Sequence, residues 1–230
     1  MLGVNNSLKG LMVDRNADSY NKIITQWSEN RNKSLLNKCV VDFAAKIKPN
    51  GKVLDIGCGT GYPITKYLSE QGFHVTGIDI SENMIEEALR LGLPNSEFYL
   101  CDFFDYQPTR KFDGVIAFDS FFHFPKLRQT EIYRRVSDWM NIGAYLLFTH
   151  GKYDSELESK MYGEVFYYSS LNIDDVYRLL SESGFTIEMI IEDYKEVTSG
   201  ERDLLVLAKK VREQQQHLPF LTSAAARHNA

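Results

Sequence analysis

Three glycines at alternate positions, together with two acidic residues, form the part of this chain best suited to hold a small molecule. Residues 53–61 read VLDIGCGTG, so a G-x-G-x-G pattern directly follows an apolar run that contains Asp55. Glycine lets a backbone turn sharply and approach a ligand that a Cβ atom would exclude. Asp79 ends a second apolar run eighteen residues after Gly61. A carboxylate at that position can accept hydrogen bonds from both hydroxyls of a ribose.

The place of Asp55 bears on the charge of this ligand. A turn that binds a dinucleotide has the form G-x-G-x-x-G and holds a pyrophosphate. Here the third glycine comes one residue earlier, and an acid lies inside the strand just before the turn. Such an acid would repel a pyrophosphate and attract an ammonium group. The sequence therefore favours a ligand with a ribose and a positively charged amine.

Strands that alternate with helices are needed to bring these residues together. Apolar runs predict seven strands, at residues 52–57, 74–79, 97–101, 112–118, 144–149, 185–191 and 204–208. The last two runs are too close to hold a helix between them, so the final strand is expected to run antiparallel to its neighbour. We expect an α/β fold of three layers, with a Rossmann-like seven-stranded sheet that is otherwise mostly parallel. Ligands of such sheets bind at the carboxyl ends of the strands.

Length and composition fit one globular domain with additions. The chain has 230 residues, of which 43% are hydrophobic and 25% charged, and its net charge of −5 disfavours nucleic acid as a partner. It shows neither a secretory leader nor an apolar run long enough to span a membrane, and its three scattered cysteines fit reduced thiols in the cytoplasm. We expect a helical cap over residues 1–50 and a ligand-binding domain over 51–210, with a lid inserted at 151–171. Residues 211–230 are expected to be a disordered tail or an added segment.

The glycine segment resembles motif I of the class I S-adenosylmethionine-dependent methyltransferases, and residues 77–81 (GIDIS) resemble the ribose motif that follows it in that family. The resemblance is strong over residues 52–120 and collinear to 208. It implies S-adenosyl-L-methionine as the cofactor and no metal. The cofactor-binding residues that it implies are Asp55 near the amino group, Gly57, Cys58, Gly59 and Gly61 along the methionine, Asp79 on the ribose, Ile80 and Met84 beside the adenine, Asp102 and Phe103 at the adenine amino group and ring, and Asp119 towards the methionine.

Two aromatic residues near the N-terminus are candidates for closing the site. Tyr20 and Trp27 lie seven residues apart and so nearly on one face of an expected helix. Similar small-molecule methyltransferases place an aromatic ring there, near the sulfonium, and an aromatic face attracts a cation. Tyr20 is therefore a candidate cofactor contact and Trp27 a candidate substrate contact. The alternative is that both rings only pin this helix to the core.

The acceptor side offers histidines and tyrosines. His123, in the loop after the fourth strand, is the first candidate for a general base, since its ordinary pKa is near neutrality; the alternative is that it shapes the loop. His150, at the end of the fifth strand, is the second candidate. Tyr153, Tyr167 and Tyr168, in the expected lid, are candidates for lining an acceptor pocket, although packing against the sheet explains them equally well.

Together these features predict a cytoplasmic methyltransferase that moves a methyl group to an O, N, S or C atom of a small molecule by in-line displacement. An RNA or protein methyltransferase, and a non-catalytic protein that binds S-adenosylmethionine, remain the alternatives. Enzymes that methylate adenine amino groups resemble one another in a proline-containing motif after the fourth strand. Residues 119–122 read DSFF at that place, without the prolines.

Overall fold

The computed structural model describes residues 5–31, 33–196 and 200–214, with side chains from Arg15 onward. The expected tail is outside this part from residue 215 on. Residues 211–214 still contact the domain: the Val211 amide donates to the Gly184 carbonyl at 2.9 Å and the Gln214 side chain to the Arg134 carbonyl at 2.7 Å. Among the described residues, no helix combines the length and apolar character that crossing a bilayer requires.

A seven-stranded sheet in the order β3-β2-β1-β4-β5-β9-β8 forms the centre of the fold. Its strands are β1 (Lys52–Ile56), β2 (His74–Asp79), β3 (Ser96–Leu100), β4 (Phe112–Ala117), β5 (Met140–His150), β8 (Phe185–Glu196) and β9 (Gly200–Lys210). The strands from β3 to β5 pair in parallel, and β9 pairs antiparallel with both β5 and β8. The predicted α/β class and the antiparallel last strand are therefore confirmed.

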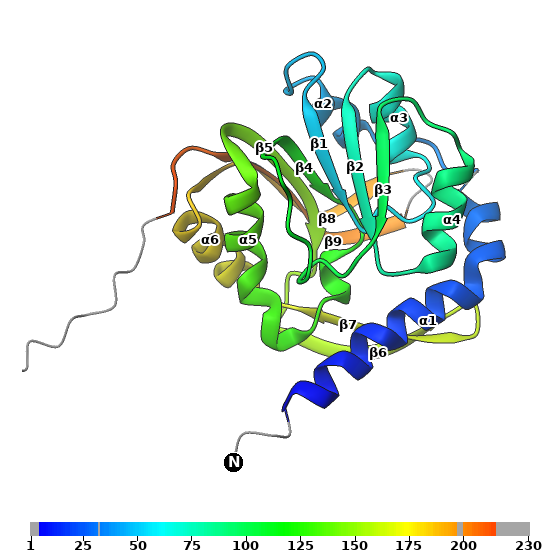
Figure 1. Ribbon diagram of the computed structural model, residues 1–230. Coiled ribbons are helices and arrows are strands. Elements are labelled where there is room, and N and C mark those ends of the chain that lie inside the picture. Colours follow the sequence, from blue (N-terminus) through cyan, green and yellow to red (C-terminus); the bar gives the residue numbers. More distant parts are fainter. Residues whose placement is uncertain (1–4, 32, 197–199, 215–230) are drawn as a thin grey trace, which may run out of the picture.

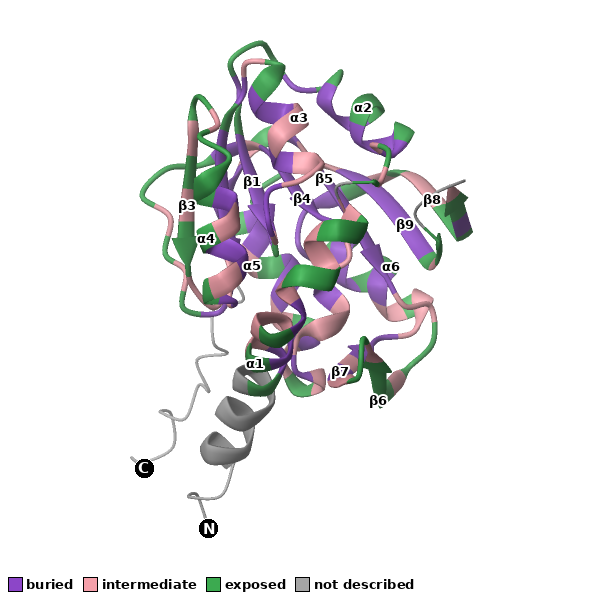
Figure 2. Cartoon of the chain, turned by 90° about the vertical axis from the view of Figure 1, so that its right-hand side faces the viewer, coloured by how far each residue is buried: buried purple, intermediate pink, exposed green. Residues whose placement is uncertain are grey.

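Helices cover both faces of this sheet (Figure 1). They are α2 (Lys38–Ala44), α3 (Ile64–Glu70), α4 (Glu82–Arg90), α5 (Ile132–Trp139) and α6 (Ile173–Glu182). A further helix, α1 (Asn5–Arg31), lies beside α4 at the carboxyl-end edge of the sheet. One buried apolar cluster joins the sheet to α2 and α3, and a second joins it to α5 and α6. Neighbouring residues of β1 show the alternation, since Val53 belongs to the first cluster and Leu54 to the second. The central strands are accordingly buried along most of their length (Figure 2).

Side-chain caps fix where two of these helices begin. The Ser81 hydroxyl accepts a hydrogen bond from the Met84 amide at 3.2 Å and so caps α4, which starts just beyond the end of β2. Asn172 caps α6 in the same way, through the Asp175 amide at 2.8 Å. Serine and asparagine are both preferred at helix N-caps. The first of them matters for the site because it sets the chain direction just after Asp79.

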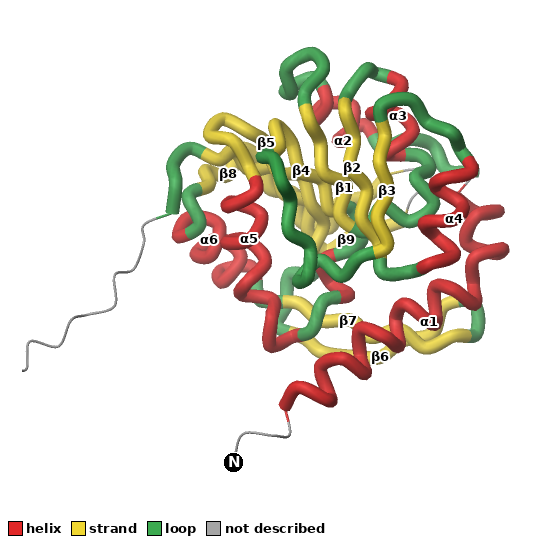
Figure 3. The backbone as a smooth tube through the Cα atoms, in the orientation of Figure 1, coloured by secondary structure: helices red, strands yellow, loops and turns green. Residues whose placement is uncertain are grey.

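The segment that the sequence assigned to a lid is a β-hairpin. Strands β6 (Ser155–Met161) and β7 (Glu164–Ser170) pair antiparallel and are separate from the main sheet. In Figures 1 and 3 the hairpin and α1 lie side by side below the carboxyl ends of the central strands. Hydrogen bonds join the two, for example from the Ser19 hydroxyl to the Val165 carbonyl at 2.7 Å. The hairpin and α1 together enclose the edge of the sheet at which ligands are expected.

Candidate functional site

A cavity at the carboxyl ends of β1, β2 and β4 brings the predicted cofactor residues together. The predicted residues that line it are Tyr20, Trp27, Asp55, Gly57, Cys58, Gly59, Asp79, Ile80, Met84, Asp102, Phe103, Asp119 and His123. Gly61 does not line it. A Cβ atom at that position would instead meet Leu91 and Phe98 at 3.3 and 3.4 Å. This glycine allows the turn to pack closely on its neighbours, and its contact with the cofactor stays a prediction.

The glycine turn is shaped so that its backbone lines the cavity. Gly57 has a φ of +73°, and a Cβ atom there would lie 2.5 Å from the Cβ atom of Ser120. Its amide donates to the Ile78 carbonyl at 2.8 Å, and the Gly59 amide donates to an oxygen of Asp79 at 2.9 Å. The turn after β1 is thus fastened to the end of β2, which holds the two predicted motifs in one geometry.

Asp79 is bound by backbone amides of both predicted motifs. One carboxylate oxygen accepts from Gly59 and the other accepts from the Ser81 amide at 2.9 Å. Each oxygen has a second lone pair, so the group can also accept from a ligand. Burial raises the pKa of Asp79, while these amide hydrogen bonds act in the opposite direction. Asp79 therefore can hold the turn and offer acceptor positions to a ribose at the same time.

Asp55 is almost completely buried, with 3% of its surface exposed. Its carboxylate accepts a hydrogen bond from the Thr65 hydroxyl of α3 at 2.6 Å. Burial raises the pKa of Asp55 to about 7. The hydrogen bond from Thr65 lowers this pKa, and the negative charge of the nearby Asp79 raises it further. Near neutral pH the group is therefore poised between its protonated and ionised forms, and a cation placed beside it would favour the ionised form.

The charges around the cavity favour a cationic ligand. Its described lining contains four carboxylates, those of Asp55, Asp79, Asp102 and Asp119, and a single arginine, Arg31. A pyrophosphate would face strong repulsion in such surroundings. This charge balance agrees with the argument made from the place of Asp55 in the sequence.

The cavity also offers polar groups that a ligand could satisfy. The hydroxyls of Thr60 and Ser120 are buried and have no hydrogen-bond partner within the described part of the chain. A buried polar group without a partner costs free energy, so both hydroxyls favour a ligand with polar atoms. Next to them, Phe103 stacks on Phe124 with ring centroids 4.9 Å apart and provides a flat apolar wall. The residues present thus fit S-adenosylmethionine, which combines a ribose, a flat base and an amino acid.

Burial makes the Cys58 thiol unreactive. The side chain is buried, and burial raises the pKa of its thiol well above the ordinary value. A protonated thiol is a poor nucleophile.

The described residues also contain no group of three or more histidine, cysteine or acidic side chains arranged to hold a metal ion.

Asp119 is held by two arginines that the sequence did not connect with it. Arg202 of β9 donates to its two oxygens at 2.8 and 2.6 Å, and Arg31 of α1 approaches at 3.4 Å. Burial alone would raise the pKa of Asp119, but these arginines hold it below the usual value. Asp119 therefore stays ionised, and its hydrogen-bonding capacity is directed largely to the arginines.

Tyr20 and His123 form a hydrogen-bonded pair at the cavity wall. The Tyr20 hydroxyl lies 2.8 Å from Nε2 of His123, and Nδ1 of the histidine lies 3.0 Å from the Tyr167 carbonyl. When Nδ1 donates to this carbonyl, Nε2 accepts from Tyr20; Nδ1 also lies 3.2 Å from the side-chain nitrogen of Asn16, which itself donates to the Tyr167 carbonyl at 3.0 Å. Burial lowers the pKa of His123 to about 4, so the ring is neutral at pH 7. Its geometry favours the loop-shaping alternative, with Tyr20 as the group presented to a ligand.

A second cavity of about 510 Å³ adjoins the first. Tyr20, Trp27, Asp119 and His123 line both cavities, so these four side chains form the boundary between them. The hairpin, the end of β5 and the start of β9 provide the other walls of the second cavity. This volume is large enough for a small organic molecule.

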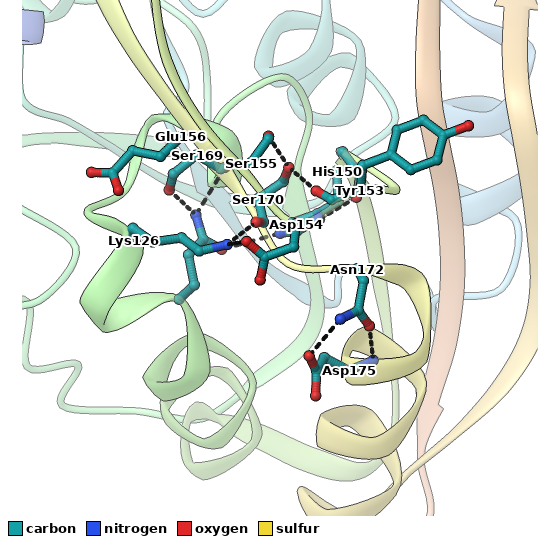
Figure 4. A network of polar contacts seen from close by, with 12 residues as sticks. Lys126, His150, Tyr153, Asp154, Ser155, Glu156, Ser169, Ser170, Asn172 and Asp175 are labelled. Carbon is teal, nitrogen blue, oxygen red and sulfur yellow. Dashed lines mark hydrogen bonds and ion pairs between the residues drawn. The ribbon is translucent and has the colours of Figure 1, made fainter.

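The three tyrosines predicted for an acceptor pocket have different positions. Tyr168 lines the second cavity, as predicted. Tyr153 is 67% exposed and lines neither cavity, and its ring points away from the neighbouring polar network (Figure 4). Tyr167 is buried and lines neither cavity; its hydroxyl accepts from the Lys126 amide at 3.0 Å and donates to Glu156 at 2.8 Å. The predicted substrate contacts of Tyr153 and Tyr167 are thus corrected.

His150 lines the second cavity, but its ring is held by the protein. Nε2 lies 3.1 Å from the side-chain oxygen of Gln129, and Nδ1 lies 2.7 Å from the Gly151 carbonyl. Burial lowers the pKa of His150 to about 4. Gln129 is fully buried and donates to the Phe121 carbonyl at 2.8 Å, so the pair fastens the loop that carries His123. The sequence did not single out Gln129, because an isolated glutamine carries no local pattern.

A family model described as a methyltransferase domain matches residues 27–190. This range covers the glycine turn, Asp79, the loop of His123 and the hairpin. The chain belongs to this methyltransferase family.

Several solved structures show the same fold as this methyltransferase domain at low sequence identity. A 1,6-didemethyltoxoflavin-N1-methyltransferase of Burkholderia thailandensis superposes with a TM-score of 0.66 at 18% identity over 92% of each chain. A magnesium protoporphyrin IX methyltransferase of Synechocystis PCC 6803, solved with bound S-adenosylmethionine, gives 0.65 at 20% identity, covering 84% of this chain and 94% of that one.

Curated methyltransferases are similar over part of their length. Sterol methyltransferase-like 2 of Botryococcus braunii is 33% identical over 132 residues, which are 54% of this chain and 34% of that protein. Phosphoethanolamine N-methyltransferase 1 of Arabidopsis thaliana is 30% identical over 154 residues, which are 64% of this chain and 31% of that protein. The methyltransferase domain described here thus spans about a third of the length of these relatives.

Ligand binding at Asp55 should release protons near neutral pH. In the free protein the raised pKa, about 7, leaves roughly half of the Asp55 groups protonated at pH 7. A bound ammonium group favours the ionised form, so binding of S-adenosylmethionine should expel up to about half a proton at that pH. Affinity should fall as the pH decreases below 7. Calorimetry in buffers of different ionisation enthalpy measures the release, and Asp55→Asn should remove it; release that persists in this variant would assign the proton to another group.

Proposed function

We propose that this protein transfers a methyl group from S-adenosylmethionine to a small molecule. The observation that carries the proposal is the pair of adjoining cavities with a shared boundary. The first has a glycine turn, a carboxylate placed to accept from a ribose and a negative lining, and it shares Tyr20, Trp27, Asp119 and His123 with the second. Family membership and the class I fold support the same activity.

The chain would hold the cofactor by groups suited to each of its parts. Asp79 would accept from the ribose hydroxyls, with Ile80, Met84 and Phe103 along the adenine. Asp55 would lie near the amino group. Arg31, which lines the first cavity, would pair with the carboxylate of the cofactor. Its guanidinium lies 4.7 Å from the centre of the Trp27 ring, and its single contact with Asp119 is long, so it keeps donors for a ligand.

The cofactor supplies a methyl group on cationic sulfur, and the bonding electron pair stays on sulfur when an acceptor lone pair takes that methyl. The contribution of the protein is then to bring the acceptor into line and to exclude water. Tyr20 serves both purposes, since its ring packs edge-on against Trp27 at 5.5 Å and its hydroxyl is fixed by His123. An aromatic ring at this boundary also favours the positive charge of the sulfonium.

The decisive experiment combines binding with transfer. Calorimetry should show that the purified protein binds S-adenosylmethionine and its demethylated product. Incubation of cell-extract metabolites with methyl-labelled cofactor and the protein, followed by mass spectrometry, should yield labelled small molecules. Label found only in RNA or protein fractions would overturn the small-molecule acceptor, and binding without any labelled product would indicate a non-catalytic protein.

The scattered cysteines remain the basis for expecting a cytoplasmic location.

His123→Ala should lower turnover more than it lowers cofactor affinity. The substitution removes the acceptor for the Tyr20 hydroxyl and leaves the Tyr167 carbonyl without this partner, and groups that position reactants commonly contribute about tenfold to a hundredfold in rate. Tyr20→Phe is the matched variant, because it removes the hydroxyl and keeps the ring. If the pair acts as a unit, the double variant should be no slower than the slower single variant. Steady-state rates and calorimetry test this, and an equal loss of rate and affinity would limit His123 to shaping the loop.

A further inference from the structure

Among the residues that the structure describes, the second cavity has one carboxylate that is left unpaired. Asp203, at the start of β9, lines this cavity and makes no hydrogen bond or ion pair with any residue that the structure describes. Its neighbours in the lining are already engaged, since Arg202 is paired with Asp119 and Glu201 lies 3.6 Å from Lys195. A carboxylate without a counter-charge beside a cavity attracts cations and repels anions.

The position of Asp203 is suited to meeting a ligand. A Cβ atom added to Gly151, which follows β5 and lines the same cavity, would lie 3.6 Å from one oxygen of Asp203. The carboxylate therefore lies over the end of β5. Asp203 is exposed, so this end of the cavity opens to solvent. A ligand could enter here and keep its charged group at the opening.

Several other polar groups of this cavity are hydrogen-bonded within the protein. The hydroxyls of Ser155 and Ser170 are 2.7 Å apart, Ser169 donates to the Phe124 carbonyl at 2.7 Å, and His150 lies between Gln129 and Gly151 (Figure 4). Of the two arginines near the boundary, Arg202 is held by Asp119, and Arg31 is assigned above to the carboxylate of the cofactor. Among the described residues, the cavity thus offers an anion the hydroxyls of Ser159 and Tyr168 but no unengaged cation, and it offers a cation one unpaired carboxylate.

Aromatic rings line the opposite side of the cavity. Tyr168 lies against His123 with ring centroids 4.8 Å apart and against Phe122 at 5.8 Å. Tyr20 and Trp27 continue this wall to the boundary with the first cavity. Aromatic faces bind apolar groups and also attract ammonium and methylammonium cations. The combination of one carboxylate and several rings is therefore matched to an amphiphilic amine.

We propose that the acceptor of this protein is a small organic amine, held in the second cavity as a cation with Asp203 as the anchor of its ammonium group. This inference rests on the proposed methyl transfer and makes it specific. With its ammonium held at the opening, such a molecule extends its other end towards the boundary with the first cavity, where a lone pair of that end would take the methyl group. The negative charge of Asp203 does not stabilise a hydroxyl or a carboxylate elsewhere on the same molecule.

Binding of three matched probes tests the anchor directly. The protein is saturated with S-adenosylhomocysteine, and calorimetry compares tyramine with its neutral alcohol analogue, tyrosol, and its acidic analogue, 4-hydroxyphenylacetate. Tyramine should bind at least about tenfold more tightly than tyrosol, and the preference should shrink as salt is added. Asp203→Asn should reduce the preference to less than about threefold. Glu201→Gln, which removes a neighbouring carboxylate that already faces Lys195, should keep most of it.

Each outcome has a defined meaning. Equal binding of tyramine and tyrosol, an unchanged preference in Asp203→Asn, or no binding of any probe at millimolar concentration overturns the amine proposal. Failure of the protein to bind S-adenosylhomocysteine, measured first, would instead overturn the proposed function on which it rests. Labelled product that is recovered only among neutral or acidic metabolites would reject the amine acceptor and leave methyl transfer in place.

Discussion

Gly57→Ala should weaken the binding of S-adenosylmethionine by at least about a hundredfold, equivalent to roughly 3 kcal/mol. The added Cβ atom would lie 2.5 Å from the Cβ atom of Ser120, so the turn or the loop after β4 has to move. The φ of +73° adds strain for any residue with a side chain. Both displacements fall on the backbone that lines the first cavity. Calorimetry measures the affinity.

Gly92→Ala is the matched control for this change. Gly92 has a φ of +59°, but a Cβ atom there meets nothing within 4 Å, and the residue lines neither cavity. The variant should lose about 1 kcal/mol of unfolding free energy through backbone strain and bind the cofactor normally. If Gly57→Ala binds within about threefold of the unmodified protein, the turn does not form the cofactor site.

Asp79→Ala should reduce the affinity for S-adenosylmethionine by roughly tenfold to a few hundredfold, about 1.5–3 kcal/mol. Part of the loss comes from ribose hydroxyls that no longer have a charged acceptor. The rest comes from the free protein, because the Gly59 and Ser81 amides lose the carboxylate that joins them across the cavity. Calorimetry on the folded variant, with thermal unfolding as a check, measures the loss.

Asp79→Asn separates these two contributions. The amide keeps one acceptor oxygen, which can satisfy only one of the two backbone amides that the carboxylate now serves. We expect an affinity between those of the unmodified protein and Asp79→Ala. Unchanged affinity in both variants would remove Asp79 from the cofactor site.

Local pattern was sufficient to predict the fold and the first cavity. The apolar runs and the short connection before the last strand depend on neighbours in sequence, and the strands and the antiparallel pairing that they predict are confirmed. The fastening of the glycine turn to Asp79 follows from the same local order, because adjacent parallel strands place their carboxyl ends together.

The sequence predicts the site least well where its pattern does not define the direction in which a side chain points. Tyr167 and Tyr168 are consecutive residues of β7, so their side chains must point to opposite faces. Only Tyr168 can face the cavity, and composition alone could not say which. Gly61 has the spacing that its motif requires. A Cβ atom at this position would point towards Leu91 and Phe98, and this direction depends on how α4 and β3 pack around the turn.

The sequence by itself determined a parallel α/β sheet, a cofactor turn with an acid on either side and a preference for a positively charged ligand. Only the tertiary structure decided what the acceptor side contains. Asp119 and Arg202 are 83 residues apart, and Tyr20 and His123 are 103 apart. Pairs so distant in sequence are selected by the packing of the whole chain and leave no local period. Burial, which neutralises His123 and leaves Asp55 half-protonated, exists only once that packing has formed.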